Sequence, residues 1–128
     1  MKTRITLRLD FDDGQRLGPG KVALLEAIRD AGSISAGARV HEMSYRKAWL
    51  LVEELNPTFD RPLVLANSGG ARGGGAALTQ TQTGETIVAC YREAERQARR
   101  SASRPIAGLE RALAPARSGN QRRLAKYA

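Results

Sequence analysis

The sequence predicts a mainly α-helical domain with one small β-hairpin, which is an α+β fold. Two short helical segments joined by a tight turn occupy residues 32–56, and a glycine-rich loop separates two short β-type segments within residues 62–79. A longer amphipathic helix pattern follows from residue 83. Helix, turn, helix and hairpin in this order are typical of a winged helix-turn-helix, a fold whose second helix can enter the major groove of DNA.

The first expected elements are a strand and a helix. Apolar and polar residues alternate over residues 4–11, which predicts a half-buried strand. Val22, Leu25 and Ile28 then recur on one face of a helix that Gly32 is expected to end. This helix supplies an apolar face to the expected core.

Two further helices are predicted from their capping residues. Ser33 is suited to cap a helix that runs to about His41, and Ser44 to cap a third helix. The third helix should end before Pro57, because the residue before a proline avoids helical dihedrals. The turn between the two helices lacks the glycine that such turns often contain. One of residues 41–43 must therefore adopt a conformation that glycine accepts more easily.

The side chains of these two helices predict how they pack. Small residues at positions 36–38 let another helix cross at close range, while Ile34 and Val40 are expected to be apolar anchors. The third helix has an apolar set at helical spacing. It consists of Ala48, Leu51, Val52 and Leu55. The polar start of the third helix is therefore expected to stay exposed.

That polar start contains the main candidate site residues. Ser44, Tyr45, Arg46 and Lys47 stand where a recognition helix meets base edges and phosphates. Arg46 and Lys47 are interpreted as DNA contacts in preference to ordinary solvated charges. For Tyr45, contact with a phosphate or base and simple coverage of the core edge are about equally supported. Trp49, the only tryptophan, is expected to pack in the core.

A hairpin with an exposed tip is predicted after the third helix. Residues 62–65 and 76–79 have the composition of short strands, and five glycines lie in the loop between them. Its single cation, Arg72, is expected to meet a minor groove or a phosphate, with a merely floppy hairpin as the alternative. The loop lacks the Gly-Lys-Ser/Thr ending of a P-loop, so a nucleotide site is disfavoured.

The remaining chain is expected to divide into a long helix and a tail. The helix at residues 83–100 has one mostly apolar stripe and could pair with a copy of itself. The stripe consists of Ile87, Tyr91, Ala94 and Ala98. Residues 101–128 mix small, basic and helix-breaking side chains, and we expect them to be partly or wholly disordered. These patterns predict a domain over residues 1–100 and a basic tail over residues 101–128.

The net charge of +8 lies mostly in that tail. Residues 1–98 hold thirteen basic and twelve acidic side chains, whereas residues 99–128 hold eight basic side chains and one acidic. The segment 32–56 has no net charge. A nucleic-acid interpretation therefore depends on where the charges stand and not on their sum.

The composition argues against several other classes of protein. One cysteine, Cys90, and one histidine, His41, provide no disulfide framework, zinc spacing or Cys/His catalytic pair. We expect Cys90 to be a small buried hydrophobe and His41 an ordinary turn residue. No facing pair of carboxylates accompanies a nucleophile, so no enzyme, cofactor or metal site is expected. No apolar run approaches a membrane span and the amino terminus is unlike a signal peptide, so a cytoplasmic location is expected.

Residues 17–56 together with residues 69–79 resemble the amino-terminal DNA-binding domain of the ModE family of molybdate-responsive transcriptional regulators. That domain is a winged helix-turn-helix close to that of LysR-type regulators. The distinctive motifs are GSIS at 32–35, SYRKAW at 44–49 and the glycine-rich loop ending in Leu-Thr, and the likeness covers about residues 4–100. The family's full-length members have carboxy-terminal molybdate-binding modules. This chain looks like a single-domain relative, so molybdate sensing is not carried over.

The resemblance implies a role for each segment. Ser33–Val40 would be the supporting helix, Ser44–Asn56 the recognition helix and Ser68–Gly75 the wing. The Thr81-x-x-Gly84-Glu85 segment looks like the family's entry into the long helix that helps to build the dimer.

The resulting expectation is a bacterial, sequence-specific regulator of transcription that binds double-stranded DNA as a homodimer. The expected DNA contacts are Ser33, Ser35, Ser44, Tyr45, Arg46, Lys47 and Arg72. Two alternatives remain open. One is an architectural, nucleoid-type DNA binder with low sequence preference, and the other is a winged-helix module for protein interaction. Whether a small-molecule effector acts on the protein is left open.

Overall fold

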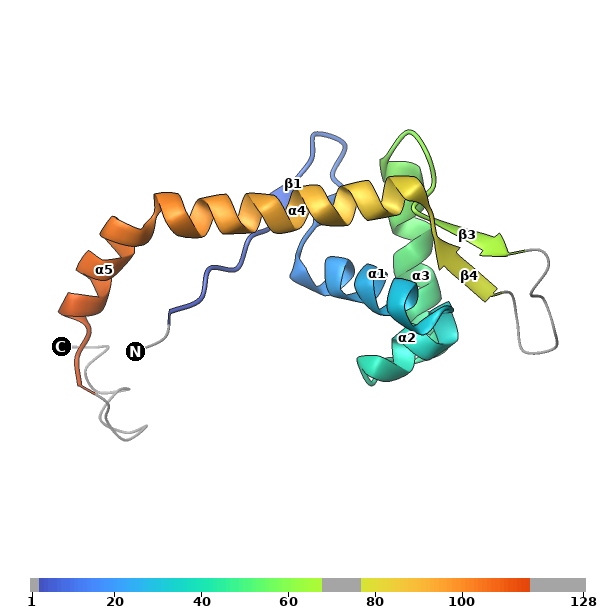
Figure 1. Ribbon diagram of the computed structural model, residues 1–128, viewed down its shortest axis with the longest axis horizontal. Coiled ribbons are helices and arrows are strands. Elements are labelled where there is room, and N and C mark those ends of the chain that lie inside the picture. Colours follow the sequence, from blue (N-terminus) through green and yellow to red (C-terminus); the bar gives the residue numbers. More distant parts are fainter. Residues whose placement is uncertain (1–2, 68–76, 116–128) are drawn as a thin grey trace.

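The computed structural model describes residues 3–67 and 77–115 of the chain. Its elements in order are β1 (Leu9–Asp10), β2 (Arg16–Leu17), α1 (Pro19–Ala31), α2 (Ile34–Val40), α3 (Tyr45–Leu55), the 3-10 turn η1 (Asn56–Thr58), β3 (Val64–Asn67), β4 (Ala77–Gln80), α4 (Gln82–Ser101) and α5 (Ser103–Ala112). Helices α1, α2 and α3 form a compact body with the β3/β4 hairpin at one end, and α4 runs across that body to α5 (Figure 1). The predicted α+β winged-helix fold is confirmed.

The core lies between α1, α2, α3 and α4, and α1 has its most extensive helix contact with α2. Val22, Leu25 and Ile28 of α1 are fully buried, as their spacing predicted. The other apolar side chains of the core are Leu17, Leu24, Ile34, Ala38, Ala48, Val52, Leu55, Leu63, Val64, Val88 and Tyr91. Ile34 is the anchor that the sequence predicted for α2, whereas Val40 is exposed at the end of that helix and anchors nothing in the described residues.

The small residues of α2 allow it to cross α1 at close range. A Cβ placed on Gly37 would lie 2.9 Å from both the backbone nitrogen and Cγ1 of Ile28. Such distances are far inside ordinary van der Waals contact, and one of the two atoms belongs to the backbone of α1. The small-residue prediction for positions 36–38 is therefore confirmed at Gly37, and the helix that crosses there is α1.

Replacing Gly37 with alanine should destabilise the domain by about 1–2 kcal/mol. Overpacking of a tight core typically costs about 1–3 kcal/mol, and the better helix propensity of alanine offsets part of that cost. Urea unfolding followed by circular dichroism measures the change. A matched control is Gly20→Ala in α1, where a Cβ would meet nothing within 4 Å. A Gly37→Ala variant as stable as the Gly20→Ala variant would contradict the close crossing.

The helix ends follow the capping residues. The Ser33 hydroxyl accepts a hydrogen bond from the Ala36 amide at 3.1 Å, and the Ser44 hydroxyl accepts one from the Lys47 amide at 3.1 Å. The turn between α2 and α3 uses Glu42 at φ 50°, a left-handed conformation that glycine accepts more easily. Both caps and the strained turn were predicted from the sequence.

The amino-terminal strand is much shorter than residues 4–11. Only Leu9–Asp10 pairs with a neighbour, and its partner is Arg16–Leu17. Ile5 and Leu7 are nevertheless half-buried while their neighbours are exposed, and the Tyr91 hydroxyl of α4 donates to the Leu7 carbonyl at 2.6 Å. The alternation therefore reports one-sided burial beside α4, and it does not require a neighbouring strand.

The first part of the expected disordered tail is a helix. α5 occupies Ser103–Ala112, and Pro105 is tolerated because it stands in the first turn, where no backbone N–H is needed. The Thr3 hydroxyl donates to the Glu110 carboxylate, which links α5 to the amino-terminal segment. Disorder is therefore wrong for these residues, and residues 116–128 lie outside the described part of the chain.

Candidate nucleic-acid interface

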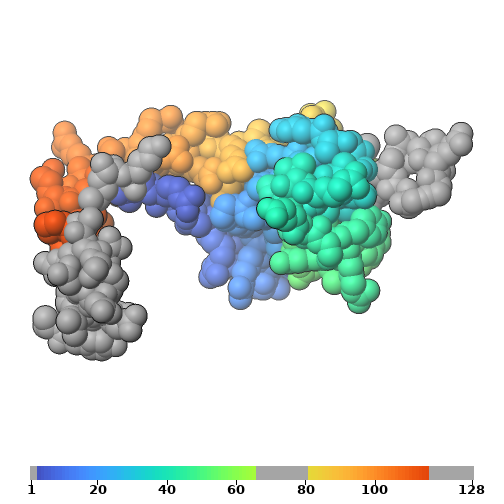
Figure 2. All heavy atoms as spheres, turned by 90° about the horizontal axis from the view of Figure 1, so that it is seen from below, coloured from blue at the N-terminus to red at the C-terminus, as the bar shows by residue number. Residues whose placement is uncertain are grey.

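One side of α3 is held in the core and the other side faces outward. Ala48, Val52 and Leu55 are buried and Leu51 is partly buried, as predicted. The exposed residues of the helix and its cap are Ser44, Tyr45, Arg46, Lys47, Trp49, Leu50, Glu53 and Glu54. Helices α2 and α3, in cyan to green, are in front when the molecule is seen from below (Figure 2).

The two cations at the start of α3 have no carboxylate partner among the described residues. Arg46 and Lys47 are exposed and belong to none of the ion pairs of that part of the chain. Other arginines, such as Arg29 with Asp30, are paired at 2.8 Å. The positive charge at the start of α3 is therefore available to an external anion.

The serines expected to contact phosphate lie near the starts of α2 and α3. Ser33 and Ser44 use their hydroxyl oxygens as caps, which leaves each hydroxyl proton free to be donated elsewhere. Ser33 and Ser35 are half-buried and Ser44 is exposed.

The predicted hairpin beside α3 is present. β3 and β4 pair antiparallel, with Val64 opposite Gln80 and Asn67 opposite Ala77, so the strands begin one or two residues later than the sequence suggested. The loop that joins them, including Arg72 and the whole of the expected wing at Ser68–Gly75, lies outside the described residues.

A side chain that the sequence interpretation missed joins α3 to this hairpin. The Asn56 amide, just after α3, donates to the Val64 carbonyl at 3.0 Å and accepts from the Leu63 and Val64 amides at 2.9 and 3.1 Å. Thr81 supports the other strand, since its hydroxyl donates to the Pro62 carbonyl at 2.8 Å. These bonds fix the base of the hairpin relative to the end of α3. An asparagine before a proline gives little sequence signal for such a role.

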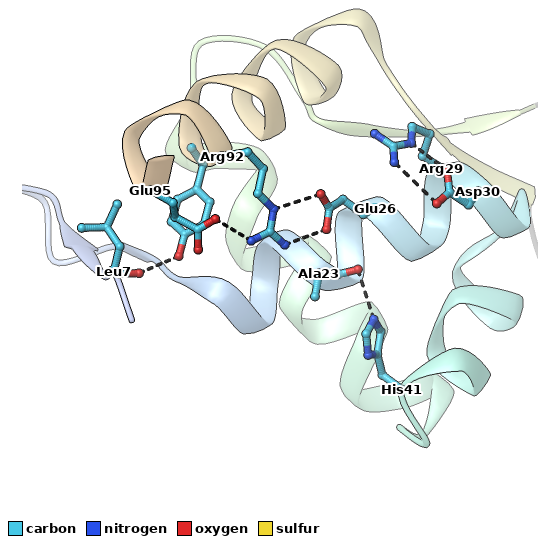
Figure 3. Close-up of polar contacts among 9 residues, drawn as sticks. Leu7, Ala23, Glu26, Arg29, Asp30, His41, Arg92 and Glu95 are labelled. Carbon is cyan, nitrogen blue, oxygen red and sulfur yellow. Dashed lines mark hydrogen bonds and ion pairs between the residues drawn. The ribbon is translucent and has the colours of Figure 1, made fainter. Parts of the chain in front are cut away.

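A second missed contact fixes α4 against α1. The Arg92 guanidinium in α4 donates to both Glu26 oxygens in α1, at 2.7 and 3.0 Å, and to Glu95 at 2.8 Å (Figure 3). It also lies 5.5 Å from the centre of the Tyr91 ring. Hydrogen bonding to Arg92 lowers the pKa of Glu26, and the same bonds raise the pKa of Arg92. Arg92 and Glu95 are not members of the apolar stripe expected for this helix, and no pattern in the sequence indicated that Glu26 is the partner of Arg92.

The structure also places three residues that the sequence analysis considered and set aside as sites, which are His41, Cys90 and Trp49. The His41 Nε2 lies 3.1 Å from the Ala23 carbonyl, which ties the end of α2 to α1 (Figure 3). Cys90 is exposed on α4, so the expectation of a buried thiol was wrong. Trp49 is exposed as well, and its expected place in the core was also wrong. Within residues 3–67 and 77–115, no cluster of three metal-ligating side chains occurs and no helix is long and apolar enough to cross a membrane.

Comparison with known proteins finds relatives that match 61–71% of the chain. No protein-family model matches it. It is 42% identical over 89 residues to the molybdenum transport protein ModE of Azotobacter vinelandii, covering 70% of this chain and 32% of that protein. It is 47% identical over 78 residues to the molybdenum-pterin-binding protein MopB of Rhodobacter capsulatus, covering 61% and 28% respectively.

A third relative has a name that states a DNA-binding activity. The chain is 35% identical over 91 residues to the DNA-binding transcriptional dual regulator ModE of Escherichia coli K12, covering 71% of this chain and 34% of that regulator. The chain thus spans about a third of the length of the curated relatives it matches. By sequence, the chain is a relative of the ModE and Mop proteins over 61–71% of its own length.

Proposed function

We propose that this protein is a member of the ModE family and acts as a sequence-specific regulator of transcription that binds double-stranded DNA. The observation that carries the proposal is the exposed start of α3. Its cations, Arg46 and Lys47, have no carboxylate partner among the described residues, while the opposite side of the same helix is fixed in the core. A rigid helix with a free polar end suits insertion into a major groove.

Each site residue has a distinct proposed role. Arg46 is suited to base edges, because its guanidinium can donate two parallel hydrogen bonds to guanine. Lys47 and Ser44 are suited to phosphates next to the helix start, and Tyr45 to a phosphate or sugar at the edge of the groove. Phosphate contacts from Ser33 and Ser35 and a groove contact from Arg72 complete the proposed interface.

We propose a homodimer in which α4 is the main contact between the two copies, with help from α1. α4 extends beyond the α1–α3 body (Figure 1), and its Ala94 and Ala98 are half-buried with small side chains that allow close helix approach. Leu109 and Leu113, in and just after α5, are exposed and would gain cover from a second copy. Two recognition helices would then meet successive major grooves about one helical turn apart.

Selection from a library of random duplexes tests this function. We expect enrichment of a two-fold symmetric site, bound at least about a thousandfold more tightly than unrelated DNA at physiological salt. Light scattering on the pure protein should give twice the chain mass of 13.9 kDa. Recovery of no preferred sequence would refute sequence-specific binding, and a monomer both free and on DNA would refute the homodimer.

The role of Lys47 can be tested by its effect on salt dependence. Lys47→Gln should reduce the slope of log affinity against log salt by about one contact per subunit, because a neutral side chain releases no counterion. Anisotropy titrations at several NaCl concentrations on the selected duplex measure the slope. Lys21→Gln near the start of α1 is the matched control. Equal slopes for the wild type and Lys47→Gln would contradict a phosphate contact.

A further inference from the structure

The outward side of α3 holds large apolar side chains that the fold leaves exposed. The side chains of Tyr45, Trp49 and Leu50 are 44%, 37% and 46% exposed, and all three lie within six consecutive residues. A single exposed apolar residue is common on protein surfaces, but such a group on one helix is typical of a binding surface. Their exposure therefore points to a partner that covers this side of α3.

Helical geometry places these side chains next to the unpaired cation. Residues four apart share one side of a helix, so Trp49 follows Tyr45 and Leu50 follows Arg46. The two rows are adjacent: the row of Arg46 and Leu50 lies opposite the buried residues of α3, and the row of Tyr45 and Trp49 lies between that row and the buried side. Trp49 and Leu50 therefore stand about 6 Å further along the helix than Tyr45 and Arg46. The outward side presents a cation first and apolar groups one turn later.

We propose that Trp49 and Leu50 contact the 5-methyl groups of thymines in the major groove, beside the bases that Arg46 contacts. This inference rests on the proposed function and adds a base preference to it. The thymine methyl is the apolar group that the major groove presents, and its neighbours present hydrogen-bonding edges. A surface on which a guanidinium lies beside apolar side chains is complementary to a groove in which hydrogen-bonding base edges lie beside methyl groups.

The charges on α3 favour DNA over a second copy or another apolar protein surface. An apolar partner would cover Arg46 and Lys47 together with Trp49 and Leu50, and burying unpaired cations is costly. DNA supplies phosphates and guanine edges for the cations and methyl groups for the apolar side chains. Glu53 and Glu54 follow on the exposed part of the last turn and would repel phosphates. Contact should therefore be concentrated in the first two turns, which span about three base pairs.

Replacing single thymines with deoxyuridine in the selected duplex tests the inference directly. Uracil keeps the pairing and hydrogen-bonding groups of thymine and lacks only the 5-methyl group. We expect one to three positions in each half-site where uracil weakens binding about fourfold, the equivalent of one buried methyl group. Trp49→Ala and Leu50→Ala should each remove the uracil effect at their own position while keeping a preferred sequence. Val40→Ala, an exposed apolar residue at the end of α2 to which no contact is assigned, is the control and should leave every uracil effect unchanged.

Trp49 also provides a direct signal, because it is the only tryptophan in the chain. Its emission should shift to the blue or be quenched when the selected duplex is added, and the change should saturate with binding. A shift that depends on protein concentration without DNA would show a second copy on this surface and overturn the inference. So would a selected duplex in which no uracil weakens binding. If the wild type selects no sequence at all, the proposed function itself fails, which separates the two outcomes.

Discussion

Replacing both Arg46 and Lys47 with alanine should lower affinity for the selected duplex at least about 30-fold, because each of two subunits loses at least about 1 kcal/mol, and should leave the folded domain intact. The variant loses one base contact and one phosphate contact per subunit, and a good bidentate contact to a base contributes about 1–3 kcal/mol. Both side chains are exposed and have no carboxylate partner in the described residues, so the melting temperature should change little. Anisotropy titration against selected and unrelated duplexes gives both affinities.

The matched control removes one arginine and one lysine from β2 and α1. Arg16 and Lys21 are close to Glu54 in the last turn of α3, about 10 Å along the helix from Lys47 at a rise of 1.5 Å per residue. Arg16→Ala with Lys21→Ala changes the net charge equally, so it should weaken selected and unrelated DNA by a similar small factor. Equal losses in the two double variants would mean that bulk charge dominates, which is the behaviour of an architectural binder.

The features that the sequence predicted well depend on nearby residues. A serine followed by a helical apolar pattern gives a cap, so Ser33 and Ser44 could be assigned without knowing the rest of the fold. The apolar spacing of α1 and α3 indicated which sides are buried. The missing glycine between α2 and α3 indicated a strained residue, and Glu42 takes that conformation. Each of these inferences uses no more than a few turns of chain.

The features that the sequence missed depend on distant residues. Trp49 is beside the buried row of α3, and it is exposed because no element of the described residues covers it. Asn56 bonds to β3, and Arg92 bonds across 66 residues to Glu26. Residues 4–8 have strand-like alternation, but no strand of the part that the structure describes pairs with them. No local pattern specifies which element lies opposite a given side chain. Residues that contact an external partner are still harder to predict from the sequence, because the partner is not part of the chain.

Replacing Arg92 with methionine should destabilise the domain by about 2–3 kcal/mol. Methionine retains much of the aliphatic packing but leaves Glu26 and Glu95 without their shared cation. The paired side chains of Arg92 and Glu26 are 29% and 27% exposed, so the cost falls between that of a surface pair and that of a fully buried one. Urea unfolding at pH 7 measures it. If α4 joins the two copies, weakening the contact between α1 and α4 should also reduce the preference of the protein for DNA with one particular half-site spacing.

Arg96→Met on the same helix is the control for this variant. Arg96 pairs with Glu93 at 2.8 Å, but the two side chains are 53% and 45% exposed, and such pairs contribute little to stability because water screens them. The chemical change is identical, so the difference between the two variants isolates the contact between α4 and α1. Equal stabilities for Arg92→Met and Arg96→Met would show that the contact with Glu26 does not hold α4 against α1.

The pH dependence of the Arg92→Met effect gives a further test of the same contact. Hydrogen bonding to Arg92 holds the pKa of Glu26 below its ordinary value of 4.5 in the folded protein. The stabilisation is therefore complete above pH 4.5 and is lost as the pH falls through the lowered pKa, where Glu26 takes up a proton. In the Arg92→Met variant the Glu26 carboxylate has lost its cation, so protonating it removes the destabilising effect of an unpaired negative charge. The difference in the free energy of unfolding between the wild type and the variant should therefore become smaller below about pH 4.5. A difference that stays constant from pH 7 to about pH 3 would mean that the variant has lost packing and not a charge interaction.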